Sequence, residues 1–92
     1  MTYIVILNIV SRCKKDNNRK NKLRKLCGKY GCKIKSDVFE VVMEDSSFMV
    51  LKNEIVSLID KKNDYVKIFK VIPKNITVYG NHNFININEL IF

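Results

Sequence analysis

The N-terminal segment constrains the fold most, because residues 2–10 (TYIVILNIV) are largely apolar at both alternating sets of positions. A strand with one solvated face alternates between apolar and polar residues, whereas a strand covered on both faces is apolar almost throughout. The segment therefore predicts a central strand that is buried on both sides. A chain of 92 residues forms one domain with one small core, so few other elements are left to cover this strand.

Two helices are predicted. The first follows a polar loop, and Asn17 or Asn18 can cap it, while Gly31 is placed to end it. Its inward stripe recurs at i, i+3, i+4 and i+7 and consists of Leu23, Leu26, Cys27 and Tyr30. The second helix begins after Ser46 or Ser47 and ends near residues 62–63. Its inward stripe consists of Phe48, Leu51, Ile55 and Leu58.

Four further segments are predicted to be strands, at residues 32–43, 64–72, 76–79 and 84–92. The order is then β-α-β-α-β with a C-terminal β-β extension. It is compatible with a small parallel doubly wound sheet or with a ferredoxin-like α+β sandwich whose two helices lie on one face. In the sandwich, Ile4 and Ile6 on the other face stay bare unless a second chain covers them. The second arrangement therefore predicts a homodimer packed through the sheets.

Positive charge is concentrated in one quarter of the chain. The formal net charge is +8, and residues 12–35 contain 11 basic residues and one acid, Asp16. Solvated helix faces usually interleave Glu with Lys, and this segment does not, so it predicts a polyanionic partner, with nucleic acid ahead of an anionic membrane surface. We expect the phosphate contacts, which position a duplex without reading its sequence, to come from Arg12, Lys14, Lys15, Arg19, Lys20, Lys22 and Lys25.

The remaining composition narrows the compartment and the chemistry. Three cysteines form no CxxC pair and cannot close a disulfide framework, which favours a reducing cytoplasm. The single histidine, His82, lies far from all of them, so a zinc site of the usual local spacing is not expected. No apolar run reaches the ~20 residues of a membrane helix, and positive charge follows the apolar N-terminus rather than preceding it. The chain is therefore expected to be cytoplasmic and without a leader or a membrane span.

The motifs in order resemble those of the CRISPR-associated protein 2 family: residues 3–9 (YIVILNI), residues 19–26 (RKNKLRKL), Tyr30-Gly31, and residues 37–40 (DVFE). That family has an apolar first strand ending in Asp-Ile, a basic R-x-N-K-L-R-K-L helix, a glycine, and a strand reading S-V-F-E. The resemblance covers the whole chain in element order and about the first 45 residues in motif.

The resemblance implies a ferredoxin-like domain over residues 1–80 and a C-terminal strand over residues 81–92 that crosses to the partner of a homodimer. It further implies a brace that holds double-stranded DNA between integrase dimers of CRISPR-associated protein 1 during spacer acquisition, a step of antiviral defence. The dimer and partner contacts expected on these grounds are Ile4, Ile6, Ile85, Ile87 and Ile91.

Some members of the family are described as metal-dependent nucleases, and this chain departs from their pattern. The family's metal-binding aspartate falls on Asn8, and an amide oxygen lacks the charge that a hard cation such as magnesium favours. We therefore expect no catalytic residue, no metal and no cofactor. Asp37, where the family usually has serine, is a weak alternative carboxylate, although a turn or salt-bridge role suits it better.

Three functions stay open at this point. The first is a sequence-independent DNA-binding scaffold of CRISPR adaptation without useful nuclease activity. The second is a metal-dependent endonuclease, acting on DNA or on RNA in the manner of related toxins, which would require magnesium. The third is a basic RNA-binding module of ribosomal type, for which the chain lacks glycine and aromatic motifs on a surface strand.

Overall fold

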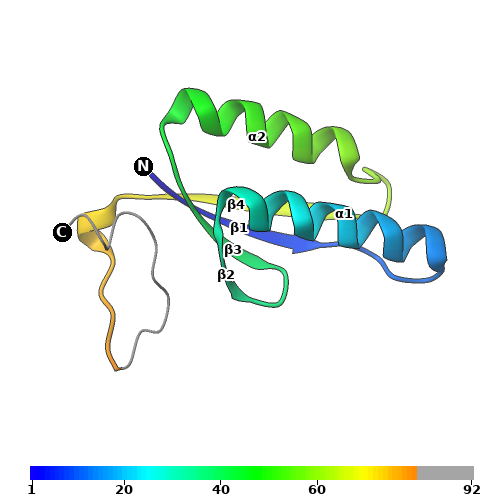
Figure 1. Cartoon of the computed structure of the whole chain (residues 1–92), viewed down its shortest axis with the longest axis horizontal. Coiled ribbons are helices and arrows are strands. Elements are labelled where there is room, and N and C mark those ends of the chain that lie inside the picture. The colour runs from blue at the N-terminus through cyan, green and yellow to red at the C-terminus, as the bar shows by residue number, and fades with distance from the viewer. Residues whose placement is uncertain (81–92) are drawn as a thin grey trace.

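The computed structural model describes residues 1–80 and contains two helices and four strands (Figure 1). In chain order the elements are β1 (Thr2–Asn8), α1 (Lys14–Tyr30), β2 (Cys32–Lys35), β3 (Val38–Val42), α2 (Asp45–Leu58), β4 (Tyr65–Val71) and a single 3-10 turn (Pro73–Asn75). The predicted strand at residues 84–92, with Ile85, Ile87 and Ile91, and the histidine His82 lie outside the described residues.

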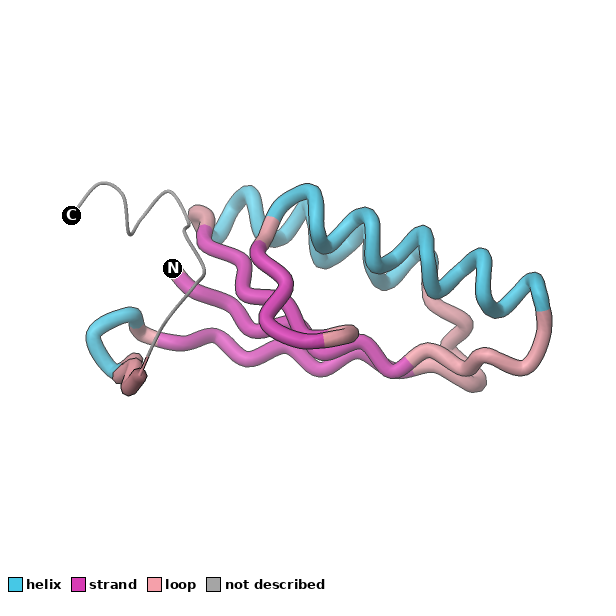
Figure 2. The backbone as a smooth tube through the Cα atoms, turned by 60° about the horizontal axis from the view of Figure 1, so that its bottom comes forward, coloured by secondary structure: helices cyan, strands magenta, loops and turns pink. Residues whose placement is uncertain are grey.

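The four strands form one antiparallel sheet in the order β2-β3-β1-β4, and both helices cover the same face of it (Figure 2). This is the predicted ferredoxin-like α+β architecture, and the parallel doubly wound alternative is wrong. β1 is central: Ile4 lies opposite Glu40 of β3 and opposite Phe69 of β4. The prediction of a central strand within residues 2–10 is confirmed. Within residues 1–80 the helices cover only one face of it, and Ile4 and Ile6 on the other face are half-buried, so burial of that face stays a prediction that depends on a second chain.

The prediction of one strand over residues 32–43 is wrong, because the chain reverses at Ser36 and Asp37 and makes the hairpin β2-β3. Asp37 has φ 67°, in the left-handed region that carboxylate and amide side chains tolerate better than most. Its carbonyl accepts a hydrogen bond from the Leu7 amide at 2.8 Å. The element order is consequently β-α-β-β-α-β rather than β-α-β-α-β.

The predicted short strand at residues 76–79 is also absent from the described chain. Pro73 begins the 3-10 turn, and residues 76–79 continue without a ladder partner. Proline cannot donate a hydrogen bond to a ladder, so β4 ends at Val71, as the prediction that Pro73 breaks the ladder requires.

The core lies between the sheet and the helices. Tyr3, Val5 and Leu7 alternate onto this side of β1 and are buried. The other buried apolar residues are Ile9, Leu23, Cys27, Phe39, Val41, Phe48, Leu51 and Ile55. The ring of Tyr3 stacks on Phe48 with centroids 3.7 Å apart, which ties β1 to α2. Both predicted helical stripes are therefore inward-facing, except that Tyr30 at the end of α1 is 44% exposed.

The helix ends differ from the prediction at three of four positions. α1 begins at Lys14, earlier than a cap at Asn17 or Asn18 implies, and α2 begins at Asp45 and ends at Leu58. The predicted end of α1 at Gly31 is confirmed. Gly31 is required for space rather than for backbone angle, because a Cβ there would lie 2.5 Å from the carbonyl oxygen of Glu40.

The sheet face opposite the helices is bare. Ile4 and Ile6 are half-buried on it, and their neighbours Tyr65 and Phe69 on β4 are 49% and 50% exposed. A shallow apolar hollow on this side is lined by Ile4, Cys32, Ile34, Glu40, Val71, Ile76 and Val78. Within residues 1–80 neither helix is long and apolar enough to cross a membrane.

Candidate nucleic-acid interface

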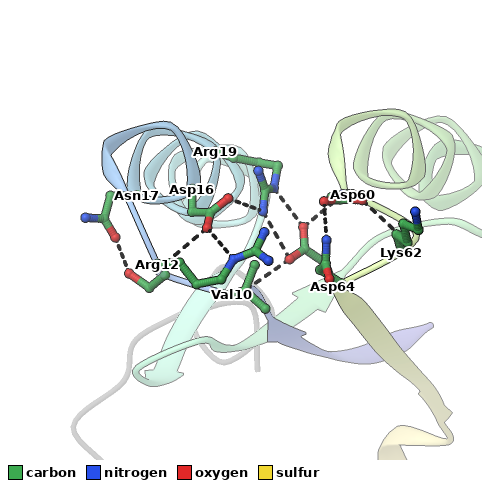
Figure 3. Close-up of polar contacts among 10 residues, drawn as sticks. Val10, Arg12, Asp16, Asn17, Arg19, Asp60, Lys62 and Asp64 are labelled. Carbon is green, nitrogen blue, oxygen red and sulfur yellow. Dashed lines mark hydrogen bonds and ion pairs between the residues drawn. The ribbon is translucent and has the colours of Figure 1, made fainter.

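The loop between β1 and α1 contains Arg12 and is held by the buried carboxylate of Asp64, a residue distant in the sequence. Asp64, just before β4, has a fully buried side chain and accepts hydrogen bonds from the backbone amides of Val10 at 3.0 Å and Asp60 at 2.8 Å. Arg19 of α1 adds two contacts to the same carboxylate, at 2.7 and 3.3 Å (Figure 3). Asp64 therefore joins the end of β1, helix α1 and the α2-β4 loop at one point.

A second carboxylate continues the network into the first turn of α1. Asp16 accepts from the backbone amide and the Nε atom of Arg12 and forms an ion pair with Arg19 at 3.1 Å. These contacts explain why α1 begins before the predicted caps, since Asp16 satisfies a backbone donor ahead of the helix. We refer to Arg12, Asp16, Arg19 and Asp64 as the loop network.

The loop network lowers the pKa values of its carboxyl groups. The pKa of Asp16 falls to about 2, chiefly because the Arg12 side chain hydrogen-bonds to it. At Asp64 burial opposes ionisation, but the hydrogen bonds from Arg19 and from the Asp60 and Val10 amides outweigh it and lower the pKa. Both groups are therefore ionised at neutral pH and keep the arginines in place.

The structure divides the seven predicted phosphate-binding residues into two groups. Arg19 is only 15% exposed, and its guanidinium is occupied by Asp16 and Asp64, while Arg12 stays 62% exposed beside Asp16. Lys14, Lys15, Lys22 and Lys25 are exposed, Lys20 is half-buried, and none of the five takes part in an ion pair within residues 1–80. All five lysines lie on α1, and they are thus the predicted phosphate-binding residues that have no ion-pair partner in the described chain.

Asn8 stands at the exposed end of β1, and its side chain has a partner that the sequence did not suggest. Its Nδ2 donates to the hydroxyl oxygen of Tyr65, the residue opposite it on β4, at 3.0 Å. This hydrogen bond lies within one chain and uses one of the two N–H donors of the Asn8 amide.

Asp37, the alternative carboxylate, is held by an arginine. Arg24 of α1 binds it through Nε at 2.6 Å and Nη2 at 3.2 Å, and this hydrogen-bonded pair lowers the pKa of Asp37. Asp37 thus has both the turn role and the salt-bridge role that the sequence favoured for it. Within residues 1–80 no group of three His, Cys, Asp or Glu side chains is arranged to hold a metal ion.

Sequence reasoning missed two residues at this end of the molecule, Asp64 and Tyr65. Asp64 lies 45 residues from Arg19, and Tyr65 lies 57 residues from Asn8. No local spacing links such pairs. The two predicted strands were the signal that could have indicated these contacts. Antiparallel pairing of β1 with β4 places the end of β1 beside the start of β4.

The fold and the basic helix together define a class: a small ferredoxin-like protein with exposed lysines along the helix that follows its first strand. The chain matches the family model described as CRISPR associated protein Cas2 over residues 1–77, and it belongs to that family.

Two curated relatives are similar to it. One is the CRISPR-associated endonuclease Cas2 of Halalkalibacterium halodurans, 27% identical over 71 residues, which are 77% of this chain and 74% of the relative. The other is the CRISPR-associated endoribonuclease Cas2 1 of Moorella thermoacetica, 24% identical over 83 residues, which are 87% of this chain and 86% of the relative.

Two solved structures have the same fold. The crystal structure of Streptococcus pyogenes Cas2 at pH 6.5 superposes with a TM-score of 0.74 at 24% identity, covering 87% of this chain and all of that chain. A hypothetical protein from Thermus thermophilus superposes with a TM-score of 0.70 at 25% identity, covering 87% of this chain and 90% of that one.

Proposed function

We propose that this protein is a cytoplasmic, sequence-independent DNA-binding scaffold subunit of the CRISPR adaptation complex. It acts as a homodimer that holds double-stranded DNA for the CRISPR integrase, CRISPR-associated protein 1. The observation that carries the proposal is the set of exposed lysines on α1, Lys14, Lys15, Lys22 and Lys25, which make no ion pair within residues 1–80.

The loop network supports this role because it holds the cations in place before DNA arrives. Asp64 and Asp16 anchor the loop from both sides, so Lys14 and Lys15 project from a helix start whose position is set by buried contacts. Cations on an ordered scaffold lose less conformational freedom when they bind phosphate than cations on a mobile loop. Contacts of this kind position a duplex and carry no sequence information.

A metal-dependent endonuclease is the second candidate, and the names of the two curated relatives favour it. Against it stand Asn8, an uncharged amide hydrogen-bonded to Tyr65, and Asp37, whose two oxygens are occupied by Arg24. A carboxylate already paired with a guanidinium has to give up that pair to bind magnesium. Cleavage of duplex DNA and of single-stranded RNA in millimolar magnesium distinguishes the candidates, and we expect both substrates to stay uncut.

The bare sheet face supports the homodimer. Ile4, Ile6 and Phe69 lie on the side of the sheet that neither helix covers, with Glu40 and Lys67 beside them, and exposed apolar surface of this kind marks an interaction site. Light scattering at low micromolar concentration should give twice the mass of the 10.8 kDa chain. A monomer under these conditions contradicts the dimer. Partner contacts through Ile85, Ile87 and Ile91 are part of the same proposal and are tested by deleting residues 84–92, which should abolish integrase association in a pull-down.

DNA binding is tested by its salt dependence. The logarithm of the binding constant should fall with the logarithm of salt concentration by about 0.9 per phosphate neutralised. The double variant Lys14→Ala/Lys15→Ala should make this slope shallower by up to about 1.8 for each protomer that contacts the duplex, with equal effects on unrelated duplex sequences. Arg12 is left unchanged, since its side chain holds Asp16 and its loss would disturb the loop itself.

The matched control is Lys35→Ala/Lys74→Ala, which removes the same charge from exposed positions outside the loop and α1. This control should retain the slope of the unmodified protein. If both double variants reduce the slope equally, the effect is one of overall charge, and the start of α1 is not the DNA-binding surface.

A further inference from the structure

The outer surface of the molecule has a groove between its two helices, on the side away from the sheet. One hollow, of about 440 Å³, is lined by Lys22, Lys25, Leu26, Lys29, Glu54, Ser57 and Leu58. A second, of about 260 Å³, is lined by Tyr30, Met43, Ser47, Val50, Leu51 and Glu54. Glu54 lines both, so the two hollows adjoin. We call them together the helix groove.

The α1 wall of the helix groove is basic. Lys22 and Lys29 are seven residues apart, so their Cα atoms are about 10.5 Å apart along the helix, with Lys25 between them. None of these three lysines forms an ion pair within the described chain, although the ammonium of Lys29 lies 5.3 Å from the ring centroid of Tyr30. The α2 wall contributes one acid, Glu54.

Apart from Ser47 and Ser57, the rest of the helix groove is apolar, and part of it is exposed. Leu26 and Leu58 are half-buried along one hollow. At the other, Val50 is 68% exposed and Tyr30 is 44% exposed. The apolar residues thus extend along the groove beside the row of lysines.

We propose that the helix groove binds an acidic amphipathic helix of a protein partner. The apolar side chains of such a helix at i, i+3 or i+4, and i+7 would rest on Leu26, Leu58 and Val50, and its carboxylates would face Lys22, Lys25 and Lys29. A helix laid between two helices is a recurrent form of peptide recognition. The complementary charges also favour the correct orientation and exclude basic partners.

Nucleic acid fits the helix groove less well, although Lys22 and Lys25 are also among the residues proposed to contact DNA. Glu54 lines both hollows of the groove and repels phosphate. The exposed Val50 side chain cannot hydrogen-bond to a phosphate group or pair with its charge. An amphipathic peptide uses both the cations and the apolar surface.

The test uses the full chain and a synthetic peptide of 15 residues, fluorescein-labelled, with leucines on one helical stripe, glutamates flanking it and alanines elsewhere. Fluorescence anisotropy should show saturable binding of this peptide. A version with lysine in place of every glutamate should bind at least tenfold more weakly. Amide chemical shifts should change at Leu26, Val50 and Leu58 rather than on the sheet face.

Two neighbouring substitutions on α2 make a matched pair. Val50→Asp places a carboxylate in the helix groove and should weaken peptide binding at least tenfold. Met49→Asp puts the same charge on the adjacent residue, which is 51% exposed and lies outside both hollows, and should change binding less than twofold. Both positions are exposed, so circular dichroism should show the same fold for each variant.

Three outcomes overturn the proposal: no saturable binding, equal effects of the two substitutions, or shift changes confined to the sheet face. A fourth does so as well, namely displacement of the peptide by duplex DNA together with weaker duplex binding in Val50→Asp, because the groove is then a nucleic-acid surface. DNA binding governed by Lys14 and Lys15 is measured separately and does not depend on the outcome.

Discussion

The buried carboxylate of Asp64 should contribute more to stability than any other ion-pairing group in residues 1–80. Asp64→Ala leaves the backbone amides of Val10 and Asp60 without their acceptor and removes the shorter of the two ion pairs of Arg19. An unsatisfied buried donor costs roughly 1–3 kcal/mol, and breaking a buried ion pair costs about 3–5 kcal/mol. These terms overlap, and Arg19 keeps Asp16 as a partner, so we expect a loss of about 4 kcal/mol in the free energy of unfolding.

Urea unfolding at one fixed protein concentration measures this loss, because the stability of an associating chain depends on concentration. With a slope of about 2 kcal/mol per molar urea, the midpoint should fall by roughly 2 M. Lys70→Ala is the control: Lys70 and Asp45 form an ion pair whose side chains are 51% and 57% exposed. Such pairs are worth about 0–1 kcal/mol. A loss below about 1 kcal/mol for Asp64→Ala refutes the view that this carboxylate anchors the loop.

Acid titration provides an independent check. The pKa of Asp64 is lower in the folded protein than the ~3.9 of an unfolded chain, so its ionised form stabilises the native state above that pH. The contribution disappears as the pH falls through the native pKa. The difference in unfolding free energy between the unmodified protein and Asp64→Asn should therefore be constant above about pH 5 and shrink below about pH 4.

Two further substitutions test local geometry. Gly31→Ala brings a methyl group to 2.5 Å from the Glu40 carbonyl oxygen and 2.7 Å from a side-chain carbon of Val41. It should destabilise the protein by about 1–3 kcal/mol in the same urea assay. An unchanged midpoint would mean that α1 and β3 separate easily. At Asp37, which has φ 67°, substitution by alanine or by glycine removes the ion pair with Arg24. The left-handed conformation is unfavourable for alanine but not for glycine, so Asp37→Ala should be less stable than Asp37→Gly by about 1 kcal/mol. Equal stability would contradict the positive φ.

The parts of the fold that the sequence predicts are those with long periodic signals. The unbroken apolar pattern of residues 2–10 indicates the central strand, and the stripe from Leu23 to Cys27 indicates the inward face of α1. The hairpin between β2 and β3 is missed because Ser36-Asp37 is not a glycine turn, and the residues around it alternate as one long strand would.

The site is less predictable than the fold because its contacts join distant segments and leave no periodic signal in the sequence. The basic residues are visible in the sequence, but which of them have free charges depends on contacts between distant segments. Arg19 resembles its lysine neighbours in sequence, yet Asp64 buries its guanidinium, while Lys22 stays exposed one turn later. Charge counting finds the region, and only the packing of β4 against β1 shows which cations are available.

The position of Asn8 allows the nuclease alternative to be tested by restoring a charge. Asn8→Asp preserves the shape of the side chain, and the Tyr65 hydroxyl, which accepts a hydrogen bond from the Asn8 amide, can instead donate one to the new carboxylate. The variant should therefore fold with less than about 1 kcal/mol change in stability, as is usual for exposed positions. Tyr65→Phe in the same background removes this hydrogen bond and should leave the carboxylate free for a cation.

Divalent metal binding by Asn8→Asp then tests whether the other groups around position 8 can still form a metal site once a carboxylate is present. Magnesium and manganese are held mainly by carboxylate oxygens, and if the bare sheet faces meet in a dimer, the two new carboxylates can act together. Calorimetry should show that Asn8→Asp binds manganese more strongly than the unmodified protein does. Asp37→Ala should bind manganese as weakly as the unmodified protein. The opposite result is strong magnesium-dependent cleavage by the unmodified protein that Asp37→Ala abolishes and Asn8→Asp does not affect. Asp37 would then have to leave Arg24 to bind the metal, and the protein would be an enzyme.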